Sequence, residues 1–199
     1  MIIFNDIAQN SEEWFKIKAG VPSASDFDRI ITTHGKPSKS QTDYAYQLAG
    51  ESIIGIREES YQSVAMQWGI EKEEDARKFY EFLTGNKVIQ VGFCMHDSKI
   101  CGCSPDGLVG DDGGVEIKCP KLKTHVGYLL DNIIPSEYYT QVQGSLYVTG
   151  RKWWDFISYY PKLKPLIIRV FPDIDFKVAL EVELNLFSQK LTKIIERIK

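Results

Sequence analysis

Three ionisable residues in the middle of the chain have the types and the spacing that metal-assisted hydrolysis needs. Asp106 follows a proline, and Glu116 and Lys118 come after it in the pattern P-D-x9-E-x-K. The glycines and aspartates between the two acids predict a tight turn between neighbouring strands. An aspartate at a strand end and a glutamate on the next strand can converge on one hard divalent cation. Lys118 lies on the same face of its strand as Glu116, about 7 Å farther along, where it can orient or deprotonate a water or offset the charge of a phosphate.

The same pattern also fits a surface hairpin that carries a Glu–Lys ladder, so the choice depends on the rest of the chain. A helix predicted within MQWGIEKEEDARKFYEF (66–82) favours catalysis. Its packing face carries a glycine, an alanine and Tyr80, but also Glu73, where an apolar residue would be expected. A third carboxylate aimed at Asp106 and Glu116 is unfavourable without a cation and useful with one or two. The other acids of this helix are expected on its solvated face, and they are Glu71, Glu74 and Asp75.

The elements around these residues predict a mixed α/β fold. The N-terminal part is typical of helices, a strand-rich middle follows, and further helices and strands complete the chain. The helices are expected over 11–18, 26–32, 40–54, 62–83, 123–131 and 135–148, with a last helix from about 175. The strands are expected over 87–96, 99–108, 114–119, 152–160 and 166–171. This order predicts a mixed central β-sheet flanked by helices, with a helical N-terminal part.

Length and composition are those of an ordinary globular chain. The 199 residues are expected to form a single domain over 1–199, and 43% hydrophobic and 26% charged residues are typical of water-soluble proteins. No apolar run approaches the ~20 residues of a membrane span and the N-terminus lacks signal-peptide features, so a cytoplasmic location and no membrane contact are expected. The net charge of −3 does not indicate nucleic-acid binding. It does not exclude such binding either, because acids around a metal can mask a basic groove.

The cysteines and histidines show no metal-ligand spacing. The chain has no CxxC pair, so its cysteines are interpreted as small core residues rather than as an iron–sulfur or zinc site. These cysteines are Cys94, Cys101, Cys103 and Cys119. The histidines are expected in loops or at the surface, and they are His34, His96 and His125.

Several segments between Trp14 and Pro161 follow one another in an order that one family shares. They are WFKIKAGVPSAS (14–25), WGIEKEEDA (68–76), CSPDGL (103–108), VEIKCP (115–120), PSEYYTQVQGSLYVTG (135–150) and FISYYP (156–161). In this order they resemble an opening W-x3-R-x-G-x3-A-S signature, a G-x3-E-x2-A helix, two catalytic strands, a glutamine-containing helix and a further strand. These are the motifs of the lambda exonuclease family, the YqaJ-type viral recombinases or alkaline exonucleases of the PD-(D/E)xK nuclease superfamily.

The resemblance implies a restriction-endonuclease-like fold and a metal site. Asp106 and Glu116 would ligate Mg2+ or Mn2+, with the backbone carbonyl of Ile117 as a further ligand. Glu73 would help to bind a second ion or to position water. Lys118 would help to activate the attacking water. Hydrolysis would then follow two-metal logic, with one ion activating water and the other stabilising the leaving 3′-oxygen.

The resemblance also implies contacts to DNA. Gln141 would orient groups around the scissile phosphate. Lys18 and Ser25, with Ser104 as a third contact, would hold the 5′-phosphate of a DNA end. The family has an arginine at the position of Lys18, and the lysine keeps the charge but loses the bidentate fork. Met66 matches an apolar wedge that separates the terminal base pairs, and a core methionine is an equal alternative.

The function that the resemblance implies is a metal-dependent 5′-to-3′ exonuclease that degrades one strand of linear duplex DNA. It would leave 3′ single strands for phage-type homologous recombination, in the bacterial host of a phage or prophage. A ring-shaped homotrimer and a single-strand annealing protein as partner are implied as well. Two alternatives remain open. One is an endonuclease or iron–sulfur nuclease of the same superfamily, and the other is a catalytically inactive DNA-end-binding module.

Overall fold

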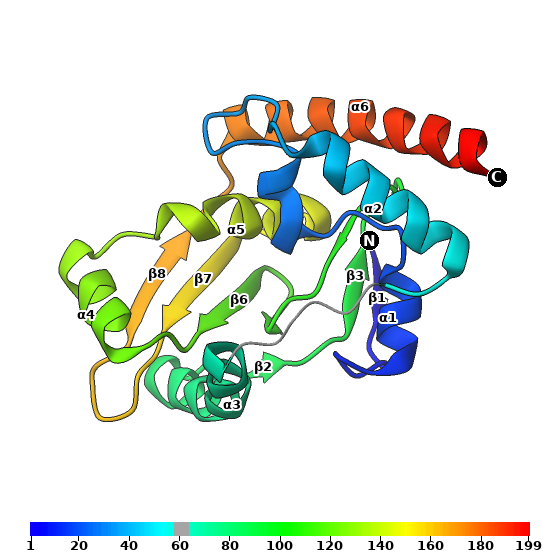
Figure 1. The fold of residues 1–199 in the computed structure, drawn as a ribbon. Coiled ribbons are helices and arrows are strands. Elements are labelled where there is room, and N and C mark those ends of the chain that lie inside the picture. The colour runs from blue at the N-terminus through cyan, green and yellow to red at the C-terminus, as the bar shows by residue number, and fades with distance from the viewer. Residues whose placement is uncertain (58–63) are drawn as a thin grey trace.

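A five-stranded mixed sheet forms the centre of the molecule (Figure 1). The computed structural model describes residues 1–57 and 64–199, and the side chains of 64–66 lie outside that description. Across the sheet the strands are β2 (Val88–Ile89), β5 (Gly107–Val109), β6 (Gly113–Lys118), β7 (Trp153–Ser158) and β8 (Leu166–Val170). In this sheet β6 and β7 run parallel, and the other neighbours run antiparallel. The predicted mixed sheet is confirmed.

The parallel pair β6–β7 requires a crossover connection, because parallel neighbours cannot be joined by a tight hairpin. Two helices form this connection, α4 (Leu122–Asp131) and α5 (Ser136–Thr149). Helix α5 follows Pro135 and ends at Gly150, whose φ of 67° is the left-handed conformation that glycine adopts at helix ends. The crossover places α5 against β7 and therefore beside the strand that carries Glu116.

Helices cover both faces of the sheet. Ala76 and Tyr80 of helix α3 (Val64–Thr84) pack with the odd-numbered residues of β6, Val115 and Ile117. The even-numbered residues of β6 point to the opposite face, where α5 lies. Glu116 therefore faces α5 rather than α3.

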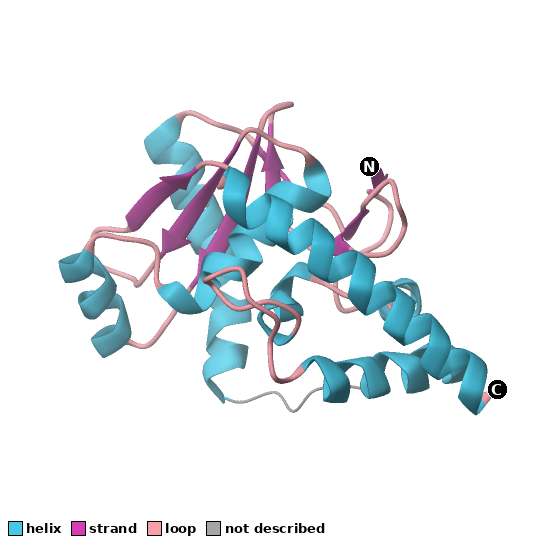
Figure 2. Cartoon of the chain, turned by 90° about the horizontal axis from the view of Figure 1, so that it is seen from above, coloured by secondary structure: helices cyan, strands magenta, loops and turns pink. Residues whose placement is uncertain are grey.

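The N-terminal helices and the C-terminal helix complete the α5 side. Helix α1 (Glu12–Lys18) begins at Ser11, whose side chain accepts a hydrogen bond from the Trp14 N–H. The 3-10 helix η1 (Ala24–Arg29) packs against α5, where Gly144 allows the close approach, since a Cβ there would lie 2.5 Å from the ring of Phe27. Helix α2 (Gln41–Ile54) packs on α6 (Ile174–Ile198), which runs along the outside of the molecule (Figures 1 and 2).

The predicted strands in the middle of the chain are wrong in extent. The segment 87–96 contains two strands, β2 and β3 (Phe93–Met95), and these belong to different sheets. The segment 99–108 is likewise divided between β4 (Gly102–Cys103) and the start of β5. The N-terminal strand β1 (Ile2–Phe4), which no pattern predicted, pairs with β3, and β3 pairs with β4.

The cysteines are buried as predicted, and one histidine prediction is wrong. All four cysteines are buried and free. His125 is fully buried in α4, where its ring bonds the Ser158 hydroxyl at 2.8 Å and the Lys164 carbonyl at 3.1 Å. Both ring nitrogens have partners there, so the histidine can be buried without an unmet hydrogen bond. In the part of the chain that the structure describes, no helix has the length and apolar character needed to cross a membrane.

Candidate functional site

The hairpin formed by β5 and β6 brings Asp106 beside Glu116. Asp106 immediately precedes β5, and the register that pairs Gly107 with Val115 places the next residues of the two strands opposite each other. The Asp106 carboxylate accepts a hydrogen bond of 2.6 Å from the Ile117 N–H. The two acids therefore meet at the end of the hairpin, as their spacing predicted.

The Glu116 carboxylate is almost fully enclosed, with its side chain 2% exposed. One of its oxygens, Oε1, accepts hydrogen bonds of 2.7 Å from Lys118 Nζ and from Gln141 Nε2. The other oxygen, Oε2, is buried and has no hydrogen-bond partner among the described residues. Gln141 belongs to α5, so the crossover helix fixes the orientation of this carboxylate. The predicted set of Asp106, Glu116, Lys118 and Gln141 is brought together.

Burial and mutual repulsion govern the charges of this cluster. The pKa of Asp106 is raised well above its usual value, first by burial and then by the negative charge of Glu116, and the Lys118 ammonium opposes this only in part. Burial by itself would lower the pKa of Lys118, but the carboxylates of Glu116 and Asp106 outweigh it and raise that pKa. Lys118 therefore carries its proton through neutral pH, which favours a role in orienting water or phosphate over a role as a base.

Glu73 lies at the edge of this cluster, on the helix that covers the other face of the sheet. Its carboxylate is 31% exposed and pairs with Arg77 at 2.6 Å. It is close enough to Asp106 to contribute to the raised pKa of that carboxyl. The other acids of the helix are exposed as expected, and they are Glu71, Glu74 and Asp75.

A cavity of about 710 Å³ opens beside Glu73. Residues 5–10, residues 90–92 and the side of α3 around Arg77 form its walls. Gln9, in one wall, donates a hydrogen bond of 2.8 Å to the carbonyl of Pro105, the residue before Asp106. The cavity is thus adjacent to the turn that carries the catalytic aspartate candidate.

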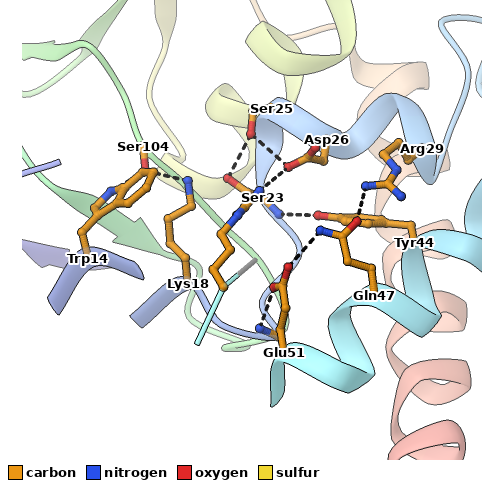
Figure 3. A network of polar contacts seen from close by, with 12 residues as sticks. Trp14, Lys18, Ser23, Ser25, Asp26, Arg29, Tyr44, Gln47, Glu51 and Ser104 are labelled. Carbon is orange, nitrogen blue, oxygen red and sulfur yellow. Dashed lines mark hydrogen bonds and ion pairs between the residues drawn. The ribbon is translucent and has the colours of Figure 1, made fainter. Parts of the chain in front are cut away.

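A second cluster surrounds Lys18 and contacts the same turn (Figure 3). Lys18 is only 4% exposed, and its ammonium donates to Ser104 Oγ at 3.3 Å. It also lies 3.8 Å from the centre of the Trp14 ring, a cation–π contact. The indole N–H of Trp14 donates to the Gly92 carbonyl at 2.9 Å and to Ser104 Oγ at 3.1 Å. Ser104 therefore links Lys18 and Trp14 to Asp106, two residues farther on.

Ser25 lies nearby but outside this set of contacts. It is exposed and bonds to Asp26 Oδ2 at 3.2 Å and to Ser23 Oγ at 3.5 Å (Figure 3). The structure brings Lys18 and Ser104 into contact and leaves the Ser25 hydroxyl at the open side of the cluster.

The surroundings of Lys18 lower its pKa. Burial first, and then the positive charge of Arg57, lower the pKa of Lys18 from 10.5 to about 7. Asp26 and Glu51 oppose this change without cancelling it. A buried lysine with a strongly lowered pKa is a candidate functional residue, and an anion bound beside it would favour its charged form.

The sequence matches the model of the YqaJ-like viral recombinase domain over residues 13–152. The chain belongs to this family. The match contains both clusters, from Trp14 and Lys18 through Asp106 and Glu116 to Gln141. It therefore confirms the resemblance that the motifs indicated.

Solved structures agree with this membership of the YqaJ-like family. The chain is similar to an alkaline exonuclease, LHK-Exo, from Laribacter hongkongensis, with 34% identity, a TM-score of 0.85 and coverage of 94% of this chain and 96% of that one. For LHK-Exo in complex with dAMP the identity is 35%, the TM-score 0.86 and the coverage 95% and 96%. A phage-related exonuclease from Haemophilus somnus 129PT shares the fold, with a TM-score of 0.70 at 13% identity over 90% and 96% of the two chains. No curated protein matches the chain.

The residues of this YqaJ-like site fit a hard divalent cation. The unpartnered Glu116 Oε2 and the raised pKa of Asp106 mark a place where negative charge is crowded and one buried carboxylate oxygen lacks a donor. Carboxylate oxygens are the ligands that Mg2+ and Mn2+ prefer. Among the described residues no three His, Cys, Asp or Glu side chains are grouped closely enough to hold a metal together. Asp106 and Glu116 would thus need the Ile117 carbonyl or water to complete the coordination.

One predicted DNA contact cannot be compared with the structure, and two arginines near the clusters were not predicted. The side chain of Met66 lies outside the described residues, so the wedge stays a prediction. The sequence did not single out Arg57, which lies near Lys18, or Arg77, which holds Glu73. The contact of Arg77 with Glu73 could have been predicted, because residues four apart on a helix are neighbours. Arg57 has no such signal, because it belongs to the irregular segment after α2.

Proposed function

We propose that the chain is a metal-dependent 5′-to-3′ exonuclease acting on linear double-stranded DNA and leaving 3′ single-stranded overhangs. The observation that carries the proposal is the cluster of Asp106, Glu116, Lys118 and Gln141, with a buried oxygen of Glu116 left unpartnered. Membership of the YqaJ-like viral recombinase domain and similarity to the alkaline exonuclease LHK-Exo support an exonuclease. The dAMP complex of LHK-Exo supports a nucleotide-containing substrate.

The residues of the cluster have separate tasks in this proposal. A divalent cation held by Asp106, Glu116 and the Ile117 carbonyl, with a second ion near Glu73, supplies Lewis acidity at the scissile phosphate. Gln141 holds the Glu116 carboxylate in place through its amide N–H. Lys118, charged at neutral pH, orients the attacking water and offsets negative charge that develops on the phosphate.

The Lys18 cluster would set the 5′-to-3′ direction in which the strand is degraded. Only Pro105 lies between Ser104 and Asp106, so the Cα atoms of these two residues are at most about 7 Å apart. A terminal 5′-phosphate bound by Lys18, Ser104 and Ser25 would therefore sit next to the cleavage site. Holding the end fixes which phosphodiester bond meets the metal ligands, and such positioning raises the rate as well as the affinity.

Assembly and partners belong to the proposal through family membership alone. A homotrimer ring around the DNA and a single-strand annealing protein that takes up the 3′ strand would fit a role in phage-type recombination. Sedimentation of the purified chain at several concentrations tests the trimer.

The test of the proposed reaction is a linear duplex with a different fluorescent label near each end of one strand. With Mg2+ the strand that begins with a 5′-phosphate should shorten from that end, and EDTA should stop the reaction. The matched control is Glu116→Gln, which keeps the side-chain shape and removes the charge. Cleavage of covalently closed circular duplex would indicate an endonuclease instead. End binding by the wild type without cleavage in Mg2+ or Mn2+ would indicate an inactive binding module.

A further inference from the structure

Near Ser104 lies a second largely buried cationic side chain besides Lys18, that of Arg57. Lys18 is 4% exposed and the side chain of Arg57 is 15% exposed. Among the described residues Lys18 makes no ion pair with a carboxylate, and its ammonium contacts a hydroxyl and an aromatic ring. The two cations are close enough that Arg57 helps to lower the pKa of Lys18. Two like charges at close range in an enclosed pocket are unfavourable unless an anion joins them.

Arg57 is anchored on one side and free on the other. Its NH2 group pairs with Asp26 Oδ2 at 2.9 Å, and the same oxygen accepts from Ser25 at 3.2 Å. Its NH1 group is buried and has no hydrogen-bond partner among the described residues. A guanidinium presents its donors as a planar fork that matches the oxygens of a phosphate. One arm of the Arg57 fork is thus held by the protein, while the other arm lacks an acceptor.

We propose that Arg57 is a specificity-determining residue that binds a terminal 5′-phosphate together with Lys18 and Ser104. This inference rests on the proposed function, since it names the group of the DNA end that the second cluster recognises. Lys18 contributes a point charge with rotatable donors, and Arg57 contributes the oriented N–H donor that the lysine lacks. Asp26 sets the position of the guanidinium and connects it to the exposed Ser25, because one of its carboxylate oxygens bonds to both.

The charge of the pocket selects the kind of phosphate. A terminal phosphate monoester carries close to two negative charges at pH 7 because its second pKa is near ~6. An internal phosphodiester carries one negative charge. Two cations balanced in part by Asp26 therefore favour a terminal phosphate over an internal one and over a 5′-hydroxyl. The pocket would in this way distinguish the end of a strand from its interior.

The test compares duplexes that differ only in a 5′-phosphate or a 5′-hydroxyl. Binding is measured by fluorescence anisotropy in EDTA, where no cleavage occurs, with wild type, Arg57→Gln and Arg57→Lys. The ratio of the two dissociation constants should fall by about tenfold or more in Arg57→Gln, because a charge-assisted hydrogen bond is lost. Binding of the 5′-hydroxyl duplex should stay within about twofold, since that end offers no acceptor dianion. Arg57→Lys should restore part of the ratio, because the charge returns without the fork.

The matched control is Arg29→Gln. Arg29 lies in the neighbouring 3-10 helix, where it stacks on Tyr44 at 4.3 Å and donates to Gln47. It should keep the wild-type ratio. If Arg57→Gln also keeps that ratio, or weakens both duplexes equally, the inference is overturned. A wild type that binds both ends equally overturns it as well, whatever its cleavage activity. A wild type that prefers the phosphate through Arg57 in EDTA but cuts no linear duplex in Mg2+ supports the inference and refutes the proposed nuclease activity.

Discussion

Replacing Lys18 by methionine should make the protein more stable and, at the same time, remove its preference for a 5′-phosphate. Lys18 is 4% exposed, and burial together with the charge of Arg57 lowers its pKa from 10.5 to about 7. The unfolded chain keeps the proton of this lysine up to about pH 10.4, whereas the folded chain loses it near pH 7. Between these values the unfolded state binds more protons, so the stability of the wild type rises with pH in this window. Below pH 7 the full cost of the buried charge is present.

The size of this cost follows from the same two pKa values. An interval from about 7 to 10.5 corresponds to roughly 5 kcal/mol of stability lost below pH 7. Methionine forgoes the cation–π contact with Trp14 and the hydrogen bond to Ser104, which together offset about 1–2 kcal/mol. A net gain on the order of 3–4 kcal/mol is therefore expected at pH 6.5. At about 2–4 °C for each kcal/mol in a chain of this size, Tm should rise by roughly 6–16 °C.

The assay is thermal unfolding of wild type and Lys18→Met in EDTA at pH 6.5 and pH 9.5. The difference between the two proteins should be large at the lower pH and small at the higher one. Lys16→Met is the control, because Lys16 lies in the same helix, is 55% exposed and pairs with Glu12. It should leave the stability within about 0.5 kcal/mol at both pH values. A Lys18→Met protein that is no more stable than wild type at pH 6.5, or whose gain is equal at both pH values, would refute the argument that Lys18 is held at a cost.

Three further predictions concern the proposed metal ligands and Gln141. Glu116→Gln should reduce the cleavage rate by on the order of 10³ or more, while binding to DNA ends in EDTA persists. Mg2+ should raise the Tm of wild type but not of this variant. An equal rise in Tm for both proteins would show that Glu116 is not a metal ligand. Without metal, Asp106→Asn should be more stable than wild type at pH 8 but not at pH 4. The reason is that the pKa of Asp106 is raised in the folded state, so wild type loses stability as the pH rises through that folded-state pKa. A stability difference that does not change with pH would contradict this argument. Gln141→Leu should lower the cleavage rate by about 10–100-fold with little change in duplex affinity, since it leaves Lys118 as the one remaining donor described for Glu116 Oε1, and unchanged rates would show that Gln141 only packs.

The pairing of Asp106 with Glu116 could be predicted from the sequence because its geometry is local. Asp106 and Glu116 belong to one hairpin, so the turn signal and the alternation of side chains fix their relation without any distant contact. Glu73 was recognised because a helical face with Tyr80 and a small residue must pack on the sheet. Gln141 and Lys18 came from the family resemblance, and the match to the YqaJ-like domain confirms that resemblance.

The parts that the sequence missed depend on contacts between distant segments. The stretch 87–96 is rich in apolar residues that favour a strand, but Gly92 lies so close to the N-terminal segment that a Cβ there would be 2.0 Å from the Ile7 carbonyl oxygen. The chain changes sheets at this point because β1 pairs with β3, and nothing in the local pattern shows that pairing. The role suggested for Arg57 was invisible for the same reason. Its significance comes from Lys18 and Asp26, which lie more than thirty residues earlier.

Ser104 is the residue that makes the two clusters one site. It receives hydrogen bonds from Lys18 and from Trp14, and Trp14 is also tied to the Gly92 carbonyl. The same short turn continues into Asp106, whose carboxylate is fixed by the Ile117 N–H. A group bound at Lys18 is therefore held at a set distance from the metal ligands by the backbone of three consecutive residues rather than by a flexible side chain. Because a fixed separation converts end binding into selection of one phosphodiester bond, the polarity of the proposed reaction would arise from this turn.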